Sequence, residues 1–283
     1  ACVPYSEEWA YKLSHASQLS VADFLKLNTA YGRYIGEQVN EFIASHGIDH
    51  AVAFIASHGH TVLHEPEHNT TCQLGDGATI AAVTGLPVIS DLRALDVALG
   101  GQGAPIVPIG DKLLFGQFDY WLNIGGIANI TVPHEGGLLA FDVCPANQVL
   151  NRLAQNAGKT MDENGAMAEQ GHLLHDVLAE LNGQEYYEIS GPKSLSNEAA
   201  IALAFPPLLE SEHSIHDMLH TMVQHIAEQV AQAIKNYPAG KEQAGILVTG
   251  GGAFNQFLVL KLQELLMPMN ITIHIPDATV IQY

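Results

Sequence analysis

The stretch YWLNIGGIANITV, residues 120–132, decides the fold because it places two apolar runs on either side of a glycine pair. Tyr120–Ile124 and Ile127–Val132 each have the composition of a β-strand, and Gly125-Gly126 separates them. Two glycines between such runs predict a β-hairpin. Glycines at its tip would permit positive φ and a close ligand approach, and unshielded N–H groups there could bind phosphate oxygens. A tight hairpin without a ligand explains the same residues.

A carboxylate follows this hairpin along the chain. A third strand is predicted at Leu138–Phe141, and it ends at Asp142. Pro145 can begin the next helix, which is predicted over residues 145–156. Helix N–H groups close to Asp142 would keep its carboxylate ionised, which suits a catalytic base. A purely structural N-cap is the alternative for Asp142.

A second glycine segment lies near the end of the chain. Gly245–Thr249 is typical of a buried strand, Gly250-Gly251-Gly252 follows it, and a helix is predicted from there to Leu266. Open α/β sheets bind ligands beyond the carboxyl ends of their strands, and helix N-termini attract anions. The segment therefore predicts a nucleotide-binding role. It has neither the Gly-Lys-Ser/Thr ending of a Walker A loop nor a GxGxxG pattern.

The remaining segments alternate between strand-like and helical patterns. The elements predicted from them are helices over residues 21–44, 76–84 (closed by Gly85), 163–170, 173–181 and 215–236, strands over 49–56, 86–89 and 271–275, a hairpin over 60–74, and an N-cap at Asp91. This alternation indicates an α/β protein. The loop Gly100-Gly101-Gln102-Gly103-Ala104-Pro105 is the expected junction between a domain at residues 1–115 and a domain at residues 116–283.

The composition excludes several classes of function. Lys and Arg total 11 against 30 Asp and Glu, a formal net charge of −19. A general nucleic-acid or anionic-membrane binder needs a basic surface, so we expect neither as a partner. No apolar run reaches 18 residues, which predicts no transmembrane helix. The cysteines at positions 2, 72 and 144 do not form a disulfide framework, which favours a reducing compartment and hence the cytoplasm.

Two polar clusters in the N-terminal half are candidates for ligand binding. Ser57-His58-Gly59-His60-Thr61 is followed by His64 and His68, but the spacing matches no common zinc motif. A metal hydrolase built on these histidines is therefore a weaker hypothesis than a histidine that contacts a polar substrate. Arg93 could hold a carboxylate through two hydrogen bonds, and an ion pair with Asp91 or Asp96 is the structural alternative.

Taken in order, these segments resemble the anhydro-N-acetylmuramic acid kinase family. The residues that carry the resemblance are Ser57–Thr61, Gln73–Asp76, Asp91–Arg93, Gly100–Pro105, Asn123–Asn129, Phe141–Asn147, Pro192–Ser194 and Gly250–Asn255. The resemblance implies two RNase H-like domains of the sugar kinase, actin and heat-shock ATPase superfamily, with ATP and Mg2+ in a cleft between them. It further implies that water opens the 1,6-anhydro bridge of the sugar while O6 receives the γ-phosphoryl group, which gives N-acetylmuramic acid 6-phosphate.

The same resemblance assigns roles to individual residues. Asp142 matches the catalytic aspartate, and Arg93 matches an arginine that contacts the substrate. Weaker assignments to the sugar pocket are Ser57, His58 and Gln102. The residues implied in nucleotide binding are Gly125, Gly126 and Asn129 near the phosphates and Gly250, Gly251, Gly252 and Asn255 near the adenosine. The metal ligands are not identified, and the family analogy suggests a homodimer.

The sequence departs from the family pattern at several places. It has no Gly-Thr-Ser-x-Asp-Gly segment near its start, no final helix after Tyr283, Cys144-Pro145-Ala146-Asn147 in place of Gly-Pro-Gly-Asn, and His60 in place of glutamine. We expect a chain that is truncated at both ends and poorly active by itself. A non-catalytic protein that binds sugar or nucleotide on the same fold is the alternative.

Overall fold

The protein divides into two compact units in a computed structural model that describes residues 2–135, 137–189, 191–209 and 213–282. One unit is Ala1–Ile106 and the other is Val107–Tyr283. The second unit begins before residue 116 because α5 (Pro108–Leu114) packs on its strands, where Thr131 Oγ1 donates to the Asp111 carboxylate at 3.2 Å.

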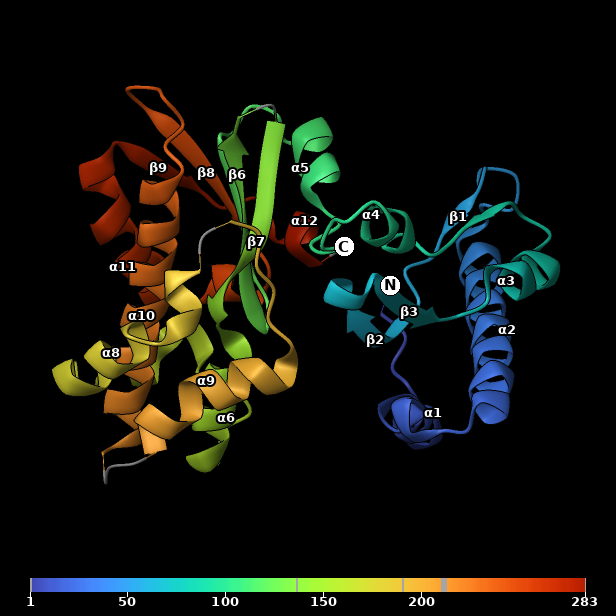
Figure 1. The fold of residues 1–283 in the computed structure, drawn as a ribbon, viewed down its shortest axis with the longest axis horizontal. Coiled ribbons are helices and arrows are strands. Elements are labelled where there is room, and N and C mark those ends of the chain that lie inside the picture. Colours follow the sequence, from blue (N-terminus) through green and yellow to red (C-terminus); the bar gives the residue numbers. More distant parts are fainter. Residues whose placement is uncertain (1, 136, 190, 210–212, 283) are drawn as a thin grey trace. The chain divides into compact units, whose positions relative to one another are not determined.

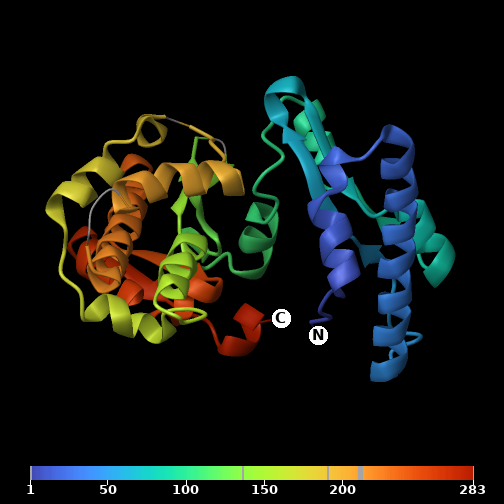
Figure 2. The same cartoon turned by 90° about the horizontal axis from the view of Figure 1, so that it is seen from below.

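The first unit is built around one long helix, α2 (Figures 1 and 2). Its elements are α1 (Glu7–Ser14), η1 (Ala16–Gln18), α2 (Val21–His46), β1 (Ile55–Ala56), β2 (His60–Glu65), η2 (Pro66–His68), β3 (Thr70–Leu74), α3 (Gly77–Thr84), β4 (Val88–Ile89) and α4 (Ala94–Ala98). Gly32 and Gly36 let α3 approach α2 closely, since an added Cβ would lie 2.7 Å from Asp76 O and 2.8 Å from Val83 Cβ respectively. The helix over 21–44, the hairpin over 60–74 and the helix closed by Gly85 are thus confirmed.

Two predictions for the first unit are wrong. The expected buried strand over 49–56 is reduced to the two residues of β1, and the Phe54 side chain is 55% exposed. Asp91 is not a helix N-cap, because α4 is preceded by Arg93. Asp91 instead adopts a left-handed conformation with φ 56°, and its carbonyl accepts a hydrogen bond from Ala94 N.

The second unit contains a five-stranded mixed sheet. Its strands are β5 (Tyr120–Ile124), β6 (Ile127–His134), β7 (Gly137–Pro145), β8 (Ala244–Thr249) and β9 (Ile271–His274), in the spatial order β7-β6-β5-β8-β9. β5, β6 and β7 pair antiparallel, whereas β8 and β9 continue the sheet parallel to β5. An antiparallel meander extended by two parallel strands is the sheet of a ribonuclease H-like domain. The predicted α/β class and the hairpin at Gly125-Gly126 are confirmed.

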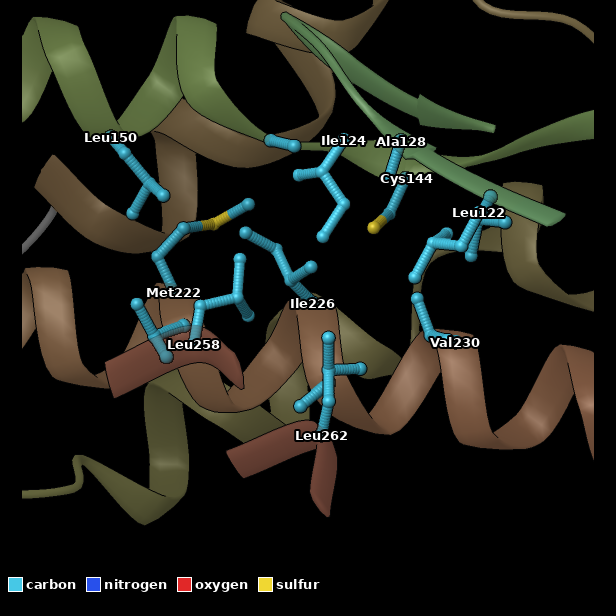
Figure 3. Packing of buried hydrophobic residues seen from close by; sticks show 14 of the residues in the cluster. Leu122, Ile124, Ala128, Cys144, Leu150, Met222, Ile226, Val230, Leu258 and Leu262 are labelled. Atoms are coloured by element: carbon cyan, nitrogen blue, oxygen red, sulfur yellow. The ribbon is translucent and has the colours of Figure 1, made fainter. Parts of the chain in front are cut away.

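Helices cover the sheet of the second unit on both faces (Figure 1). They are α6 (Asn147–Asn156), η3 (Glu163–Gly165), α7 (Ala166–Glu169), α8 (His175–Asn182), η4 (Glu185–Glu188), α9 (Asn197–Leu209), α10 (Ile215–Asn236), η5 (Gly251–Phe254), α11 (Gln256–Leu266), η6 (Met267–Met269) and α12 (Ala278–Gln282). Figure 3 shows Val230 of α10 beside the sheet residue Leu122, and Met222 of the same helix farther along, near Leu150 and Leu258, all within the main core. None of the helices in the described residues is long and apolar enough to cross a membrane.

Candidate functional site

A row of polar side chains crosses four strands of the second unit. Asp142 of β7 pairs with Asn129 of β6, Asn129 pairs with Asn123 of β5, and Asn123 pairs with Thr249 of β8. Residues directly opposite each other in a sheet point to the same face. The neighbouring residues Leu122 and Ile130 belong to the main core, so the polar row lies on the opposite face. The fold therefore aligns two predicted site residues, Asp142 and Asn129.

A β-bulge at Val143 gives Asp142 its place in this row. The register between β6 and β7 shifts from Asn129–Asp142 to Ala128–Cys144, which leaves Val143 as the extra residue. As a result Val143 and Cys144 both enter the core, although they are consecutive. Without the bulge, strict alternation would place Cys144 on the same face as Asp142.

The structure corrects the predicted surroundings of Asp142. β7 does not end at Asp142 but continues to Pro145, and α6 begins only at Asn147 after the residue Ala146. Asp142 is therefore not the N-cap of α6. Its Oδ2 atom instead accepts a hydrogen bond from the backbone N–H of Leu195 at 2.9 Å. Such a bond favours the ionised carboxylate that a general base requires.

The hairpin tip at Gly125-Gly126 also differs from expectation. Neither glycine has positive φ, and the N–H of Gly125 is already bonded to Ile127 O at 3.2 Å. The carbonyl of Gly125 accepts from Asn147 N, and the carbonyl of Gly126 accepts from Ala146 N. The tip is thus anchored on the start of α6, and Gly125 does not offer the unshielded N–H group that the sequence suggested.

The three glycines after β8 play different parts. Gly250 has φ 78°, and a Cβ there would lie 2.3 Å from Asn123 Oδ1. A Cβ on Gly252 would lie 2.2 Å from Ile124 Cγ2. Both positions need glycine because the chain crosses the end of β5 at close range. At Gly251 the nearest atom would be Asn147 Nδ2 at 3.5 Å, which is ordinary van der Waals contact.

Gly251 borders a cavity of 420 Å³ in the second unit. Its lining also includes Asn147, Asn151, Asp162, Glu163 and the predicted residue Asn255. A cavity of this volume lies in the range of small-molecule sites, about 300–1,000 Å³. The fold thus brings Gly251 and Asn255 together around one cavity.

A second cavity, of 250 Å³, opens on the polar row. Asn123, Asn129, Thr249 and Gly250 line it, and Asp111 of α5 joins them. Burial raises the pKa of the Asp111 carboxyl, an effect that the hydrogen bond from Thr131 partly offsets. Sequence reasoning missed Asp111, because only the fold brings α5 to this face of the sheet.

The predicted sugar-binding residues gather in the first unit around Arg93. Its Nε donates to His58 Nε2 at 2.9 Å, and its Nη1 donates to Gly103 O at 2.6 Å. The other ring nitrogen of His58 lies 3.0 Å from Gly59 O. Because a guanidinium N–H can only donate, His58 Nε2 is the acceptor in this contact, and His58 orients the Arg93 guanidinium.

The glycine-rich loop that carries Gln102 is packed on α4. The Asp96 carboxylate accepts a hydrogen bond from Gly103 N at 2.6 Å, and a Cβ on Gly101 would lie 2.2 Å from the same carboxylate. Asp96 thus shapes this loop. Ser57 is buried. Its N–H donates to Ile89 O and so extends the pairing of β1 with β4 by one hydrogen bond.

The histidines of the first unit do not converge on one point. His68 contacts Glu65, whereas His64 bonds Thr71 Oγ1 and has a buried Nε2 atom without a hydrogen-bond partner in the described part of the chain. Burial, and then the charge of Arg93, lower the pKa of His64. Within residues 2–135 and the other described ranges, no three His, Cys, Asp or Glu side chains are grouped to hold a metal ion. The histidine-based metal hypothesis gains no support from this arrangement.

The sheet order and the polar row at its strand ends define a ribonuclease H-like α/β protein. The chain belongs to the anhydro-N-acetylmuramic acid kinase family, whose sequence model matches residues 6–280.

Relatives from several bacteria carry the same family name. The chain is 37% identical over 232 residues to the anhydro-N-acetylmuramic acid kinase of Paramagnetospirillum magneticum, covering 80% of this chain and 64% of that protein. It is 33% identical over 247 residues to the Nitrosomonas europaea protein of that name, covering 84% and 67%. The chain thus spans about two thirds of the length of these relatives.

A solved structure of (R)-2-hydroxyglutaryl-CoA dehydratase component A from Acidaminococcus fermentans has a TM-score of 0.40 and 14% identity, covering 74% of this chain and 69% of that chain.

Proposed function

We propose that the protein is an ATP-dependent sugar kinase that opens 1,6-anhydro-N-acetylmuramic acid with water and phosphorylates O6. The product is N-acetylmuramic acid 6-phosphate. The observation that carries the proposal is the polar row, in which Asp142 and Asn129 share one face of the sheet with Thr249, the residue before the three glycines. Membership of the kinase family supports it.

The proposed chemistry needs a single base. Asp142 takes a proton from the water that attacks the anomeric carbon, and the bond from that carbon to O6 breaks. The released O6 then attacks the γ-phosphorus of ATP, the bond from that phosphorus to the bridging oxygen breaks, and ADP leaves, so one deprotonation serves both events. A positioned base of this kind contributes about 10²–10⁴-fold to the rate. The backbone N–H of Leu195 supports the role because it bonds the ionised form of Asp142.

The nucleotide is proposed to lie in the second unit. Gly251 and Asn255 border the cavity for the adenosine, and Gly126 and Asn129 hold the phosphate end. Gly125 contributes there by shaping the hairpin tip, because its N–H is bonded to Ile127 O. Asn255 Oδ1 accepts from Leu258 N at 3.0 Å, which caps α11 and fixes one wall of the cavity. Gly250 and Gly252 act indirectly, by letting the loop cross β5. Mg2+ would neutralise phosphate charge, and the carboxylate and amide oxygens of the polar row suit such a hard cation.

The sugar is proposed to bind to the first unit. Its lactyl carboxylate gives the Arg93 guanidinium a matching acceptor. His58 acts through Arg93 rather than by its own hydrogen bonds, because both ring nitrogens are already engaged. Ser57 and Gln102 remain proposed contacts of the sugar.

We further propose that the reaction takes place in the cytoplasm, where ATP is available and the free cysteines stay reduced.

Incubation of the full-length protein with the anhydro-sugar, ATP and Mg2+ tests this proposal. We expect consumption of ATP that depends on the sugar and equals the sugar phosphate formed. Omission of the sugar is the control for idle ATP hydrolysis. Binding of both ligands without turnover would indicate a non-catalytic binding protein instead. Sedimentation of the same sample tests the predicted homodimer.

A further inference from the structure

The outer edge of β7 pairs with a loop segment in an unusual way at Asp142. The N–H of Asp142 donates to Lys193 O at 3.0 Å, which is the first of the two hydrogen bonds that a parallel bridge would have. In a regular parallel bridge the N–H of Leu195 would complete the pair by donating to Asp142 O. It donates to the Asp142 carboxylate instead, at 2.9 Å. The Asp142 carbonyl accepts from the Tyr186 hydroxyl, at 2.6 Å.

We propose that Tyr186 is a positioning residue: by occupying the backbone carbonyl of Asp142, its hydroxyl leaves the Leu195 N–H for the carboxylate. This inference rests on the proposed role of Asp142 as the base. Tyr186 lies in η4, and its own carbonyl accepts from Lys193 Nζ at 2.9 Å. The Lys193 ammonium also lies 4.3 Å from the centre of the Tyr186 ring, so the loop and the ring hold each other in place.

The surroundings of Tyr186 keep its hydroxyl a donor. Burial, and then the charge of Asp142, raise the pKa of Tyr186 above its ordinary value, so the phenol stays protonated at neutral pH. A protonated phenol has one O–H to give, and here it goes to Asp142 O.

Loss of this hydroxyl would leave the Asp142 carbonyl without that donor. A carbonyl that loses its partner costs free energy, and the Leu195 N–H is the donor that a regular ladder would supply. Its transfer to the carbonyl would remove a hydrogen bond from the carboxylate. A carboxylate that loses such a bond takes up a proton more readily.

The test compares Tyr186→Phe with Tyr187→Phe. Tyr187 lies in the same turn and is a matched control, because its hydroxyl bonds His225 Nε2 at 2.9 Å rather than Asp142. In Tyr186→Phe we expect the acid limb of the kcat–pH profile to move up by about 0.5–1 pH unit, the worth of one hydrogen bond. The KM values for ATP and sugar stay within twofold of the parent. In Tyr187→Phe the acid limb stays in place.

A second measurement does not depend on turnover. With 13C-labelled aspartate carboxyls, the Asp142 signal is identified by its loss in Asp142→Asn and is titrated by NMR. The proposal predicts a higher titration midpoint in Tyr186→Phe and an unchanged midpoint in Tyr187→Phe. An unchanged midpoint in Tyr186→Phe, or an equal rise in both variants, would overturn it. If Asp142→Asn keeps full turnover while the midpoint still rises in Tyr186→Phe, the proposed base is wrong and the positioning contact stands.

Discussion

His58 Nε2 accepts a hydrogen bond from Arg93 Nε, since a guanidinium only donates, and His58 Nδ1 lies 3.0 Å from Gly59 O. We predict that His58→Leu weakens binding of the anhydro-sugar by roughly tenfold or more, the worth of one hydrogen bond to a charged group. The affinity for ATP should stay within twofold. Isothermal titration of each ligand measures both values.

The control for this prediction is His68→Leu in the same segment of the first unit. His68 contacts Glu65 and not Arg93, so its loss should leave sugar binding unchanged. Equal sugar affinities of the parent and His58→Leu would contradict the orienting role of His58.

The sequence was sufficient to select residues for the proposed site, but not to predict the hydrogen bonds that each of them makes. Arg93 could be selected because few side chains in this acidic chain carry a guanidinium, and Asp142 because it matches the catalytic aspartate of the family that the sequence resembles. The donors to His58 Nε2 and to the Asp142 carboxylate could not be predicted, because Arg93 lies 35 positions from His58 and Leu195 lies 53 positions from Asp142.

Among the elements, those with strong periodicity were predicted best. The apolar face of α10 at helical spacing fixed its bounds, and the glycine pair fixed the β5–β6 hairpin. The end of β7 was misjudged because the bulge at Val143 has no signature in the sequence. α9 was missed because Pro206 and Pro207 interrupt its pattern, although Ala200, Ala204 and Leu208 are buried.

The contact between α8 and α10 predicts a pH-dependent stability. His225 of α10 is buried between Tyr187 and Asn182, and burial lowers its pKa to about 3. The unfolded chain takes up this proton below about pH 6.5. The stability that depends on neutral His225 is therefore complete above that pH and is lost as the pH falls toward 3.

Urea unfolding at pH 7 and pH 5 measures this effect. Between these values the parent should lose about 2 kcal/mol more of its unfolding free energy than His225→Gln, since each pH unit below about 6.5 costs about 1.4 kcal/mol. Equal losses in the two proteins would show that His225 is not the group responsible.

At the level of the whole molecule, the two units have unequal cores. The buried cluster of the first unit consists of Leu13, Ala16, Leu27, Tyr31 and Leu74. That of the second unit extends through the sheet, α6, α10 and α11. We predict that a fragment of residues 107–283 unfolds cooperatively on heating, whereas a fragment of residues 1–106 does not, because too little apolar surface is buried. Circular dichroism melts of both fragments test this. A sharp thermal transition of the isolated fragment of residues 1–106 would contradict the prediction.

The glycine-rich loop at residues 100–105 lies beside the boundary between the two units, which follows Ile106, but the unit to which residues 107–115 belong could not be predicted. Residues 107–115 carry no signal that ties them to the later strands. The ties are the bonds from Thr131 to Asp111 and from Trp121 Nε1 to Phe115 O, which only the folded sheet creates.

The claim that Asp142 is the base is tested most directly by Asp142→Asn, with turnover and ATP binding measured on the same preparation. The amide keeps the shape of the carboxylate but cannot take a proton from water. We predict that formation of the sugar phosphate falls by at least about 10²-fold while the dissociation constant for ATP stays within twofold. Turnover by Asp142→Asn at the rate of the parent would contradict the account.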